Sequence, residues 1–405
     1  MSANKQKRIM LLGGLRYLLP VIDVAHKQGY YVITADYLPN NIAHKYSDEY
    51  CNVSIIDKEA VLKEAIRLQI DGIMSFAVDP GVMAAAYVAE KLGLPFQCSY
   101  KSACILQNKS KFRSFLSDNN FNVPNAKYYD NVQNAIDDIK TFNFPLMVKP
   151  VDSAGSKGVS KVDSKEFLQP AIEYALSESH IGHFIIEDYL EKVGYSSDSD
   201  CFALNGDLCF CSFSDQMFDD DADNPFTPAA YIWPSTMPVS AQNELKSELQ
   251  RLMSLLNVGT GLFNVETRIC SDGKAYIMEV SPRGGGNRLS EMLEVITSVN
   301  LIRYAVRSAV GDPVDGIVQP EYHGYLAEVI LHSRKNGLFK ELKMNRIVTD
   351  NYLIEKDLWV KEGDYVDSFS GANKAIGTIS LMADSRESLD NIMRNIDDFV
   401  NVDVV

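Results

Sequence analysis

Two glutamates are expected to face each other across a β-hairpin in the second half of the chain. In the segment GLFNVETRICSDGKAYIMEVSPR, two apolar-alternating runs flank an Asp-Gly dipeptide, which is a strong hairpin turn signal. With Asp272 and Gly273 as the loop, the strand register places Glu266 directly across from Glu279, unless a one-residue bulge shifts it. The hairpin therefore predicts a carboxylate pair on one sheet face.

A carboxylate pair of this kind calls for a cation. Directly opposed Cβ atoms lie about 5 Å apart, and like charges at that spacing destabilise a sheet. Carboxylate oxygens without His or Cys suit Mg²⁺, which shares its remaining positions with phosphate oxygens. The alternative is a solvated sheet face that carries two ordinary glutamates.

Arg283 and three glycines follow the second strand. An arginine beside a metal site can clamp a transferring phosphoryl group with its planar fork of donors. The backbone N–H groups of Gly284 to Gly286 can meet a developing negative charge. The alternative is a flexible loop that joins a strand to a helix.

Two lysines supply positive charge upstream. Lys149 ends an apolar strand, where an ammonium without a partner is costly. A loop of small residues follows, able to close over phosphates through its backbone amides: Ser153, Ala154, Gly155, Ser156 and Gly158. Its spacing is not GxxxxGK[ST], which disfavours a P-loop. Lys109 heads a helix and, taken alone, would be an ordinary surface lysine.

The elements around these residues belong to two kinds of structure. Residues 8–98 alternate strands and helices, which predicts a small parallel α/β unit. Gly13, Gly14 and Asp36 are spaced unlike GxGxxG, so a tight strand-to-helix turn is favoured over a dinucleotide site. Further on, a helix is expected over 109–123.

The second half of the chain reads as strands, one long helix and one long loop. A hairpin is expected at Asn205-Gly206. Residues 215–238 read as a long loop rich in Asp and Pro, whose Asp cluster attracts an ammonium or, more simply, is a solvated acidic loop. The tail from 321 is strand-rich.

Composition excludes several classes of protein. A net charge of −15 over 405 residues argues against nucleic-acid binding. No apolar run approaches the roughly 18 residues that span a bilayer. The start MSANKQKRIMLLGG has too short an apolar stretch for a signal peptide, so a first buried strand is expected. Seven irregularly spaced Cys indicate a reduced, cytoplasmic protein, and six scattered His give no zinc-type cluster.

The order of these features resembles the ATP-grasp superfamily over residues 8–320. The tail, with VILHSRKNGLF and AIGTISLMADSRESLDNIMRNI, is similar to the C-terminal domain of L-amino-acid ligases and related carboxylate-amine ligases. The resemblance implies an α/β and α+β protein with the ATP-grasp fold and related to biotin carboxylase-like enzymes. It implies a parallel α/β domain over 1–108, an ATP-grasp domain over 109–320 with a lid near 125–190, and a small strand-rich α+β domain over 321–405.

The resemblance also implies roles for individual residues. Lys109 and Lys149 look like the two phosphate-binding lysines, and Ser153 to Gly158 like the lid loop. Glu187 and Leu190 match the adenine pocket, Asp200 falls where the family often has Asp, and Glu266 and Glu279 match the Mg²⁺ ligands. Ser281 stands where an Asn contact to metal or phosphate is usual. No Glu occupies the ribose position, which leaves Ser196, Ser197 and Asp198 as candidates.

The implied activity is ligation through an acyl phosphate, with ATP and Mg²⁺ as cofactors and Mn²⁺ as the alternative ion. Arg283 or Arg288 would bind the attacking carboxylate, Lys149 would act on the transferring group, and the glycine amides would hold the oxyanion. The expected partners are a small-molecule carboxylate and an amine, and a homodimer is a family-level expectation. A phosphotransferase on the same fold is the alternative. A non-catalytic nucleotide-binding module is disfavoured, because both lysines, both glutamates and the arginine are present.

Overall fold

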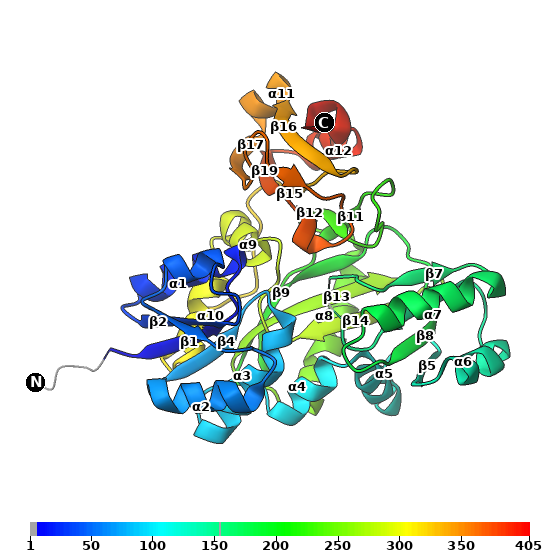
Figure 1. The fold of residues 1–405 in the computed structure, drawn as a ribbon. Helices are drawn as coiled ribbons and strands as arrows, with labels where there is room; N and C mark the ends of the chain where they lie inside the picture. The colour runs from blue at the N-terminus through cyan, green and yellow to red at the C-terminus, as the bar shows by residue number, and fades with distance from the viewer. Residues whose placement is uncertain (1–5, 154) are drawn as a thin grey trace, which may run out of the picture.

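The computed structural model describes residues 6–153 and 155–405. Residues 1–5 of the basic N-terminal stretch and Ala154 of the Gly/Ser loop lie outside these ranges. Within the described residues, one parallel sheet and four antiparallel sheets confirm the mixed α/β and α+β class (Figure 1).

A parallel sheet forms the N-terminal unit, in the order β3-β2-β1-β4. Its strands are β1 (Arg8–Leu12), β2 (Tyr31–Asp36), β3 (Glu49–Asn52) and β4 (Gly72–Ser75). Helices α2 (Lys58–Leu68) and α3 (Asp79–Leu92) cover one face, and α1 (Leu19–Lys27) with α10 (Leu301–Ala309) covers the other. Burial on both faces explains why the strand sequences are almost continuously apolar. Residues just after 300 therefore pack back onto the first domain.

The lid is an antiparallel sheet in the order β5-β8-β6-β7, drawn in green at the right of Figure 1. Its elements are β5 (Ala126–Tyr129), α6 (Val132–Asp138), β6 (Leu146–Pro150), β7 (Ser160–Val162), α7 (Leu168–Ser177) and β8 (Phe184–Asp188). Helices α4 (Tyr100–Leu106) and α5 (Lys109–Asp118) connect the N-terminal unit to the lid, and α5 ends five residues before the expected 123.

The central sheet has the order β10-β9-β13-β14 and faces the lid. Its strands are β9 (Ser197–Leu204), β10 (Asp207–Cys211), β13 (Gly261–Ile269) and β14 (Ala275–Ser281), and α8 (Val239–Leu255) packs behind them. The β9–β10 turn lies at Asn205-Gly206 as predicted, and both residues have positive φ values, 53° and 90°.

The expected long loop over 215–238 is wrong. Residues 215–218 and 228–233 form β11 (Asp215–Phe218) and β12 (Pro228–Trp233), which add to the C-terminal sheet in the order β11-β12-β15-β19-β17. The apolar run AAYIW has the pattern of a buried strand, and only 219–227 between the strands is irregular. One sheet therefore contains strands from both sides of residue 320.

The remaining elements complete the C-terminal domain and its support. They are α9 (Leu289–Thr297), β15 (Tyr325–Leu331), β16 (Gly337–Met344), α11 (Arg346–Asn351), β17 (Leu353–Leu358), β18 (Tyr365–Val366), β19 (Gly377–Ala383), α12 (Arg386–Arg394), α13 (Ile396–Phe399) and β20 (Val400–Val404). A small sheet in the order β18-β16-β20 closes the domain. No helix among the described residues has the length and apolar character needed to cross a bilayer.

Candidate active site

Glu266 and Glu279 are directly paired across β13 and β14, as predicted. The expected two-residue loop is wrong, because the turn closes between Cys270 and Lys274, one residue earlier on the first strand. A bulge at Met278 then offsets this shift, and the pairing beyond the bulge returns to the predicted register. Two departures of one residue each cancel and leave the glutamates face to face.

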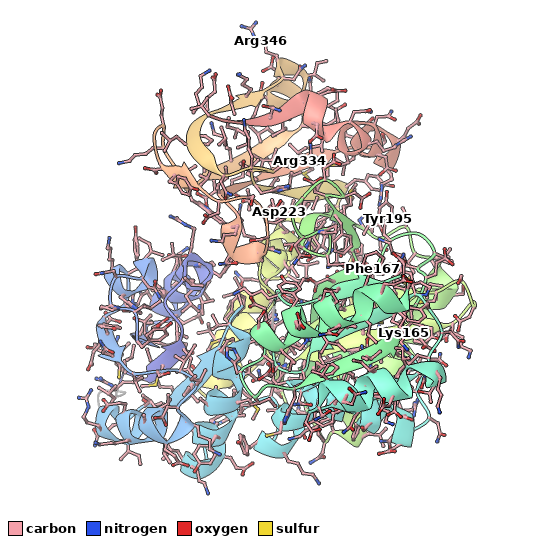
Figure 2. The ribbon with its side chains drawn as sticks, turned by 45° about the vertical axis from the view of Figure 1, so that its right-hand side comes forward. Lys165, Phe167, Tyr195, Asp223, Arg334 and Arg346 are labelled. Atoms are coloured by element: carbon pink, nitrogen blue, oxygen red, sulfur yellow. The ribbon has the colours of Figure 1, made fainter. Side chains whose placement is uncertain are left out.

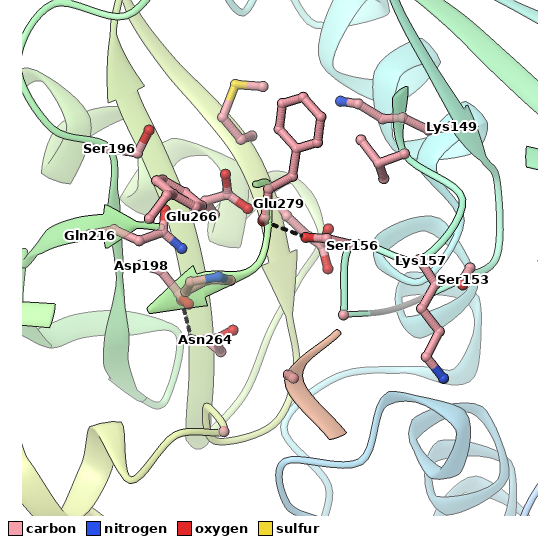
Figure 3. A pocket seen from close by; sticks show the side chains of 18 of the residues that line it. Lys149, Ser153, Ser156, Lys157, Ser196, Asp198, Gln216, Asn264, Glu266 and Glu279 are labelled. Carbon is pink, nitrogen blue, oxygen red and sulfur yellow. Dashed lines mark hydrogen bonds between the residues drawn. The ribbon is translucent and has the colours of Figure 1, made fainter. Parts of the chain in front are cut away.

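Each glutamate of the pair has a cation beside it. Arg268 Nη2 lies 3.1 Å from Glu266 Oε1, and Lys109 Nζ lies 3.4 Å from Glu279 Oε2. Both carboxylates remain about one-third exposed, at 32% and 38%, and open into the cavity of Figure 3. Among the described residues, no group of three or more His, Cys, Asp or Glu forms a metal cluster. Two carboxylates with room for further oxygen ligands fit Mg²⁺ bound together with phosphates.

The glutamate pair lies in a cavity of about 890 Å³ between the lid, the central sheet, the N-terminal unit and the C-terminal domain. Residues predicted for the site that line it are Lys109, Lys149, Ser153, Gly155, Ser156, Glu187, Leu190, Ser196, Asp198, Glu266, Glu279 and Arg283. Met147 and Met278 also line the cavity, and Leu190 packs against the small apolar cluster that contains Met278.

Glu187 holds two cations. Its carboxylate accepts hydrogen bonds from Lys149 Nζ at 2.6 Å and Arg113 Nε at 2.8 Å, and its side chain is only 2% exposed. Burial alone would raise the Glu187 pKa, but Arg113 and Lys149 outweigh burial and lower the pKa to about 2. The carboxylate therefore positions Lys149, a role that sequence reasoning missed when it assigned Glu187 to the adenine edge. Arg113 also donates to the carbonyl of Met278 at 2.8 Å, which anchors the bulge.

Lys109 contacts both the Gly/Ser loop and the pair formed by Glu266 and Glu279, which is called the metal pair below. Besides Glu279, its ammonium donates to the carbonyl of Ser153 at 3.1 Å. Burial lowers the Lys109 pKa, but Glu279 and Asp79 outweigh this effect and leave the pKa raised. The loop itself rests on residues 224–226: Ser156 Oγ donates to the Phe226 carbonyl at 2.8 Å, a bond drawn in Figure 3. Gly158, predicted to bind phosphate, lies outside the cavity lining and packs against Glu178 and Pro150.

Arg283 lines the cavity, but most of its donors are already engaged. Nε and Nη2 donate to the two oxygens of Asp79 at 2.9 and 2.7 Å, and Nη1 donates to Asn264 Oδ1 at 2.9 Å and to the Gly284 carbonyl at 3.0 Å. Asp79 was not predicted. Its signal was its place just after the carboxyl end of β4, where parallel sheets bind ligands.

Ser281, which was predicted as a metal ligand, makes its hydrogen bonds to other side chains in this structure. Its hydroxyl donates to Asp79 Oδ1 at 2.8 Å and accepts from Gln107 Nε2 at 2.7 Å, and it lies outside the cavity lining. The side chain is therefore committed to holding Asp79 rather than to a metal ion.

Asp200, which was predicted as a cofactor contact, lies outside the cavity lining. It is fully buried and accepts from the backbone N–H of Gly285 at 2.8 Å and from the Ser290 hydroxyl. The side chain therefore anchors the glycine loop, and the Gly285 amide is not available as an oxyanion donor. Ser197, a ribose candidate, is equally buried and accepts from the Ser214 backbone N–H at 2.9 Å.

Arg288, which was predicted to bind the attacking carboxylate, lies outside the cavity lining. Its guanidinium contacts Glu291 at 3.1 Å, Glu328 at 3.6 Å and Glu355 at 2.6 Å. Glu328 and Glu355 belong to the C-terminal sheet, so Arg288 fastens α9 to that domain. Closeness in sequence to Arg283 was a misleading signal, because Arg283 contacts the N-terminal unit whereas Arg288 contacts the C-terminal sheet.

Asp198 lies beside the metal pair. Its Cα pairs with that of Glu266 across β9 and β13, and it accepts from Asn264 Nδ2 at 2.7 Å (Figure 3). Burial, followed by the nearby charge of Glu266, raises the Asp198 pKa to about 7. Three neighbouring strands thus each present one carboxylate to the cavity.

The Asp-rich segment after β11 fastens the C-terminal domain. Asp219 is 8% exposed and contacts Arg334 at 2.7 Å and His332 at 3.0 Å. Asp223 accepts from the hydroxyl of Ser368, and Figure 2 shows Asp223 and Arg334 at this junction. The expected solvated acidic loop is therefore wrong for Asp219, which is consumed by ion pairs.

Known proteins resemble the chain over most of its length. An ATP-grasp domain model matches residues 142–291. A formate-dependent phosphoribosylglycinamide formyltransferase from Bacteroides thetaiotaomicron is 25% identical over 77% of this chain and 79% of its own length. A counterpart from Shewanella frigidimarina is 26% identical over 80% of the chain and 79% of its own length.

Solved structures share the whole architecture. The L-amino acid ligase from Bacillus licheniformis has a TM-score of 0.83 at 19% identity and covers 100% of both chains. The phosphoribosylglycinamide synthetase from Anaerococcus prevotii has a TM-score of 0.75 at 18% identity, covering 99% of this chain and 100% of its own. At these identities the structures establish the fold, and the matched domain lies over the lid and the glutamate pair. The chain therefore contains an ATP-grasp domain over residues 142–291 and shares the architecture of ATP-grasp enzymes.

Proposed function

We propose that the enzyme joins a small carboxylic acid to an amine through an acyl phosphate and releases ADP and phosphate. The observation that carries the proposal is the Glu266–Glu279 pair inside one cavity that Lys109, Lys149 and Arg283 also line. Phosphoryl transfer needs positioning and charge neutralisation rather than a protein nucleophile, which fits this residue set.

The nucleotide is proposed to lie between the lid and the central sheet. Leu190, Met147 and Met278 would enclose the adenine, and Lys149, oriented by Glu187, would meet the phosphates. Glu266 and Glu279 would hold Mg²⁺, which would neutralise charge on the transferring phosphoryl group, with Mn²⁺ as the alternative ion. A solved relative, the biotin carboxylase domain of the Hydrogenobacter thermophilus 2-oxoglutarate carboxylase, carries MgADP and has a TM-score of 0.74 at 16% identity over 98% of this chain and 91% of its own.

The reaction is proposed to run in two steps. A substrate carboxylate oxygen attacks the γ-phosphorus, the bond to the bridging oxygen breaks, and ADP leaves. The amine nitrogen then attacks the acyl carbon, the carbon–oxygen bond to phosphate breaks, phosphate leaves and the nitrogen loses a proton. Arg283 would orient the acid with its free N–H, because Asp79 holds the guanidinium still.

Mg-ATP with a panel of amino acids, dipeptides and amino sugars tests the proposal through ADP release. Hydroxylamine added to an active mixture should trap the acyl phosphate as a hydroxamate in step with ADP. A stable phosphoester or phosphoramidate without hydroxamate would instead identify a phosphotransferase. No ADP release beyond the rate without acid, across an extended acid panel, would contradict both.

Two further proposals concern cellular setting. We place the enzyme in the cytoplasm, where its seven free thiols, Cys51, Cys98, Cys104, Cys201, Cys209, Cys211 and Cys270, would stay reduced. A homodimer is proposed as its assembly. Subcellular fractionation and light scattering on the purified protein test these two points.

A further inference from the structure

A directional chain of hydrogen bonds runs from the N-terminal unit to Asp198, the neighbour of Glu266 in the central sheet. The Tyr17 hydroxyl donates to Asn287 Oδ1 at 3.4 Å, and Asn287 Nδ2 donates to the Tyr231 oxygen at 3.1 Å. The Tyr231 hydroxyl then donates to Asp198 Oδ2 at 3.2 Å. All four side chains line the cavity. Because every bond points the same way, the chain ends on an acceptor, the carboxylate of Asp198.

Two more buried polar atoms beside this endpoint have no hydrogen-bond partner within the described residues. Gln216 Oε1 and Ser196 Oγ are buried and make no hydrogen bond within the described residues. Gln216 is 3% exposed and Ser196 is 1% exposed, and both line the same cavity. Gln216 pairs with Tyr231 across β11 and β12, and Ser196 bridges to Gln216. A buried acceptor without a donor is unfavourable, because it has given up its hydrogen bonds to water, so these two atoms indicate a ligand group that supplies several donors.

The chemistry of the three side chains selects the kind of group. A carboxylate and an amide oxygen only accept, and the hydroxyl completes a set that matches the three N–H donors of an ammonium. The charge agrees as well, since Asp198 and Glu266 are paired neighbours in the sheet and both are acidic. An anionic group would meet repulsion from both.

We propose that Asp198, Gln216 and Ser196 hold the amino group of the amine substrate, with Tyr231 and Asn287 as positioning residues. This assignment rests on the proposed ligase function. The subsite lies between the metal pair and the glycine loop that ends at Asn287, the part of the cavity where the amine must reach the acyl carbon. The ammonium loses one proton to solvent before its nitrogen attacks, and the nitrogen loses a second proton after the attack, the one named in the second step above. Ribose hydroxyls are the competing donors.

Direct binding separates these possibilities without turnover. L-Alaninamide carries an amino group and no carboxylate, so it probes the amine subsite alone. In titration calorimetry with Mg²⁺ and a non-hydrolysable ATP analogue present, the wild-type enzyme should bind it. Asp198→Asn should weaken that binding at least tenfold and Tyr231→Phe about threefold, while affinity for the ATP analogue changes less than twofold. Asp207→Asn, an exposed change on the adjoining strand β10, is the matched control and should leave both affinities unchanged.

Three results would overturn the assignment. The first is no binding of L-alaninamide by the wild-type enzyme, and the second is equal binding of L-alaninamide by the variants and the control. In the third case, Asp198→Asn would weaken binding of the ATP analogue and leave binding of L-alaninamide unchanged. That result would identify Asp198 as a ribose contact. Hydroxamate formation by the wild-type enzyme reports on the ligase proposal separately. If no hydroxamate forms but amine binding still depends on Asp198, the ligase proposal is wrong and the amine subsite stands.

Discussion

Arg283 and Asp79, separated by 204 positions in the chain, form a two-bond ion pair that joins the end of β14 to the start of α3. Four of the five N–H groups of Arg283 are engaged by this pair, Asn264 and the Gly284 carbonyl. Burial lowers the Arg283 pKa, but the Asp79 charge outweighs burial and raises it. The N-terminal unit thus fixes the direction of the one donor left for substrate.

Loss of this ion pair should impair catalysis more than nucleotide binding. Asp79→Asn keeps the shape but removes the charge that orients Arg283, and we expect kcat to fall about 10–100-fold with little change in KM for ATP. A double-mutant cycle with Arg283→Lys should show strong coupling, because both changes break the same contact. Additive effects on kcat would mean that Asp79 acts independently of Arg283.

The metal pair should be essential for ATP turnover. Glu279→Ala removes one carboxylate and leaves Lys109 without its partner, and we expect ADP release to fall by at least about 10²-fold. The melting temperature should stay close to that of the wild-type enzyme, because Glu279 is one-third exposed. Glu362→Ala, on an exposed loop, is the control. Full turnover with unchanged Mg²⁺ dependence in Glu279→Ala would reject the site.

The buried triad of Glu187, Lys149 and Arg113 should make stability sensitive to acid. The folded pKa of Glu187, about 2, lies below its usual value of about 4.3, so its stabilisation is present above pH ~4.3 and is lost as pH falls toward 2. Glu187→Gln leaves two buried cations unpaired and should cost about 3–5 kcal/mol at pH 7. Urea unfolding from pH 3 to 7 measures both effects.

A control for the triad lies on the lid surface. Asp163→Asn breaks an exposed ion pair with Lys161 and should change the free energy of unfolding by less than about 1 kcal/mol. The triad would not stabilise the fold if Glu187→Gln had the same free energy of unfolding as this control and the same loss of stability between pH 7 and pH 3 as the wild-type enzyme.

Glu328 should respond to pH in the opposite direction. Burial raises its pKa to about 8, even though Arg288 and Ser380 lower it. The folded protein therefore binds a proton that the unfolded chain has released, and stability should fall as pH rises from about 4.3 to 8. Glu328→Gln should flatten the dependence of the melting temperature over this window. Parallel melting curves for variant and wild-type enzyme from pH 5 to 9 would contradict this.

Sequence reasoning was most effective where short-range patterns decide the structure. Continuous apolar strands between amphipathic helices predicted the parallel N-terminal unit, and one Asp-Gly turn predicted the facing of Glu266 and Glu279. The bulge at Met278 could not be read from the pattern, because its residue fits either strand face. The correct register came from two compensating shifts.

Long-range partners of charged residues were not predictable. Arg283 and Arg288 are near neighbours at the two ends of one glycine-rich segment, yet one pairs with Asp79 of the N-terminal unit and the other with Glu355 of the C-terminal sheet. Ser281 fitted a ligand position by strand spacing, and only the proximity of Gln107 and Asp79 shows that its hydroxyl is already engaged. Tertiary packing decides these outcomes.

The sharing of one sheet between β11–β12 and the strands after residue 320 has a consequence for protein engineering. Trp233 and Tyr231 on β12 are fully buried, and β12 pairs along its length with β15. A chimaera joined at residue 320 would expose the β12 edge that pairs with β15, together with its aromatic side chains. Such an unpaired strand edge promotes aggregation. Exchange of the C-terminal module between relatives would have to carry residues 215–233 along with it, so the transplantable piece is discontinuous in the gene.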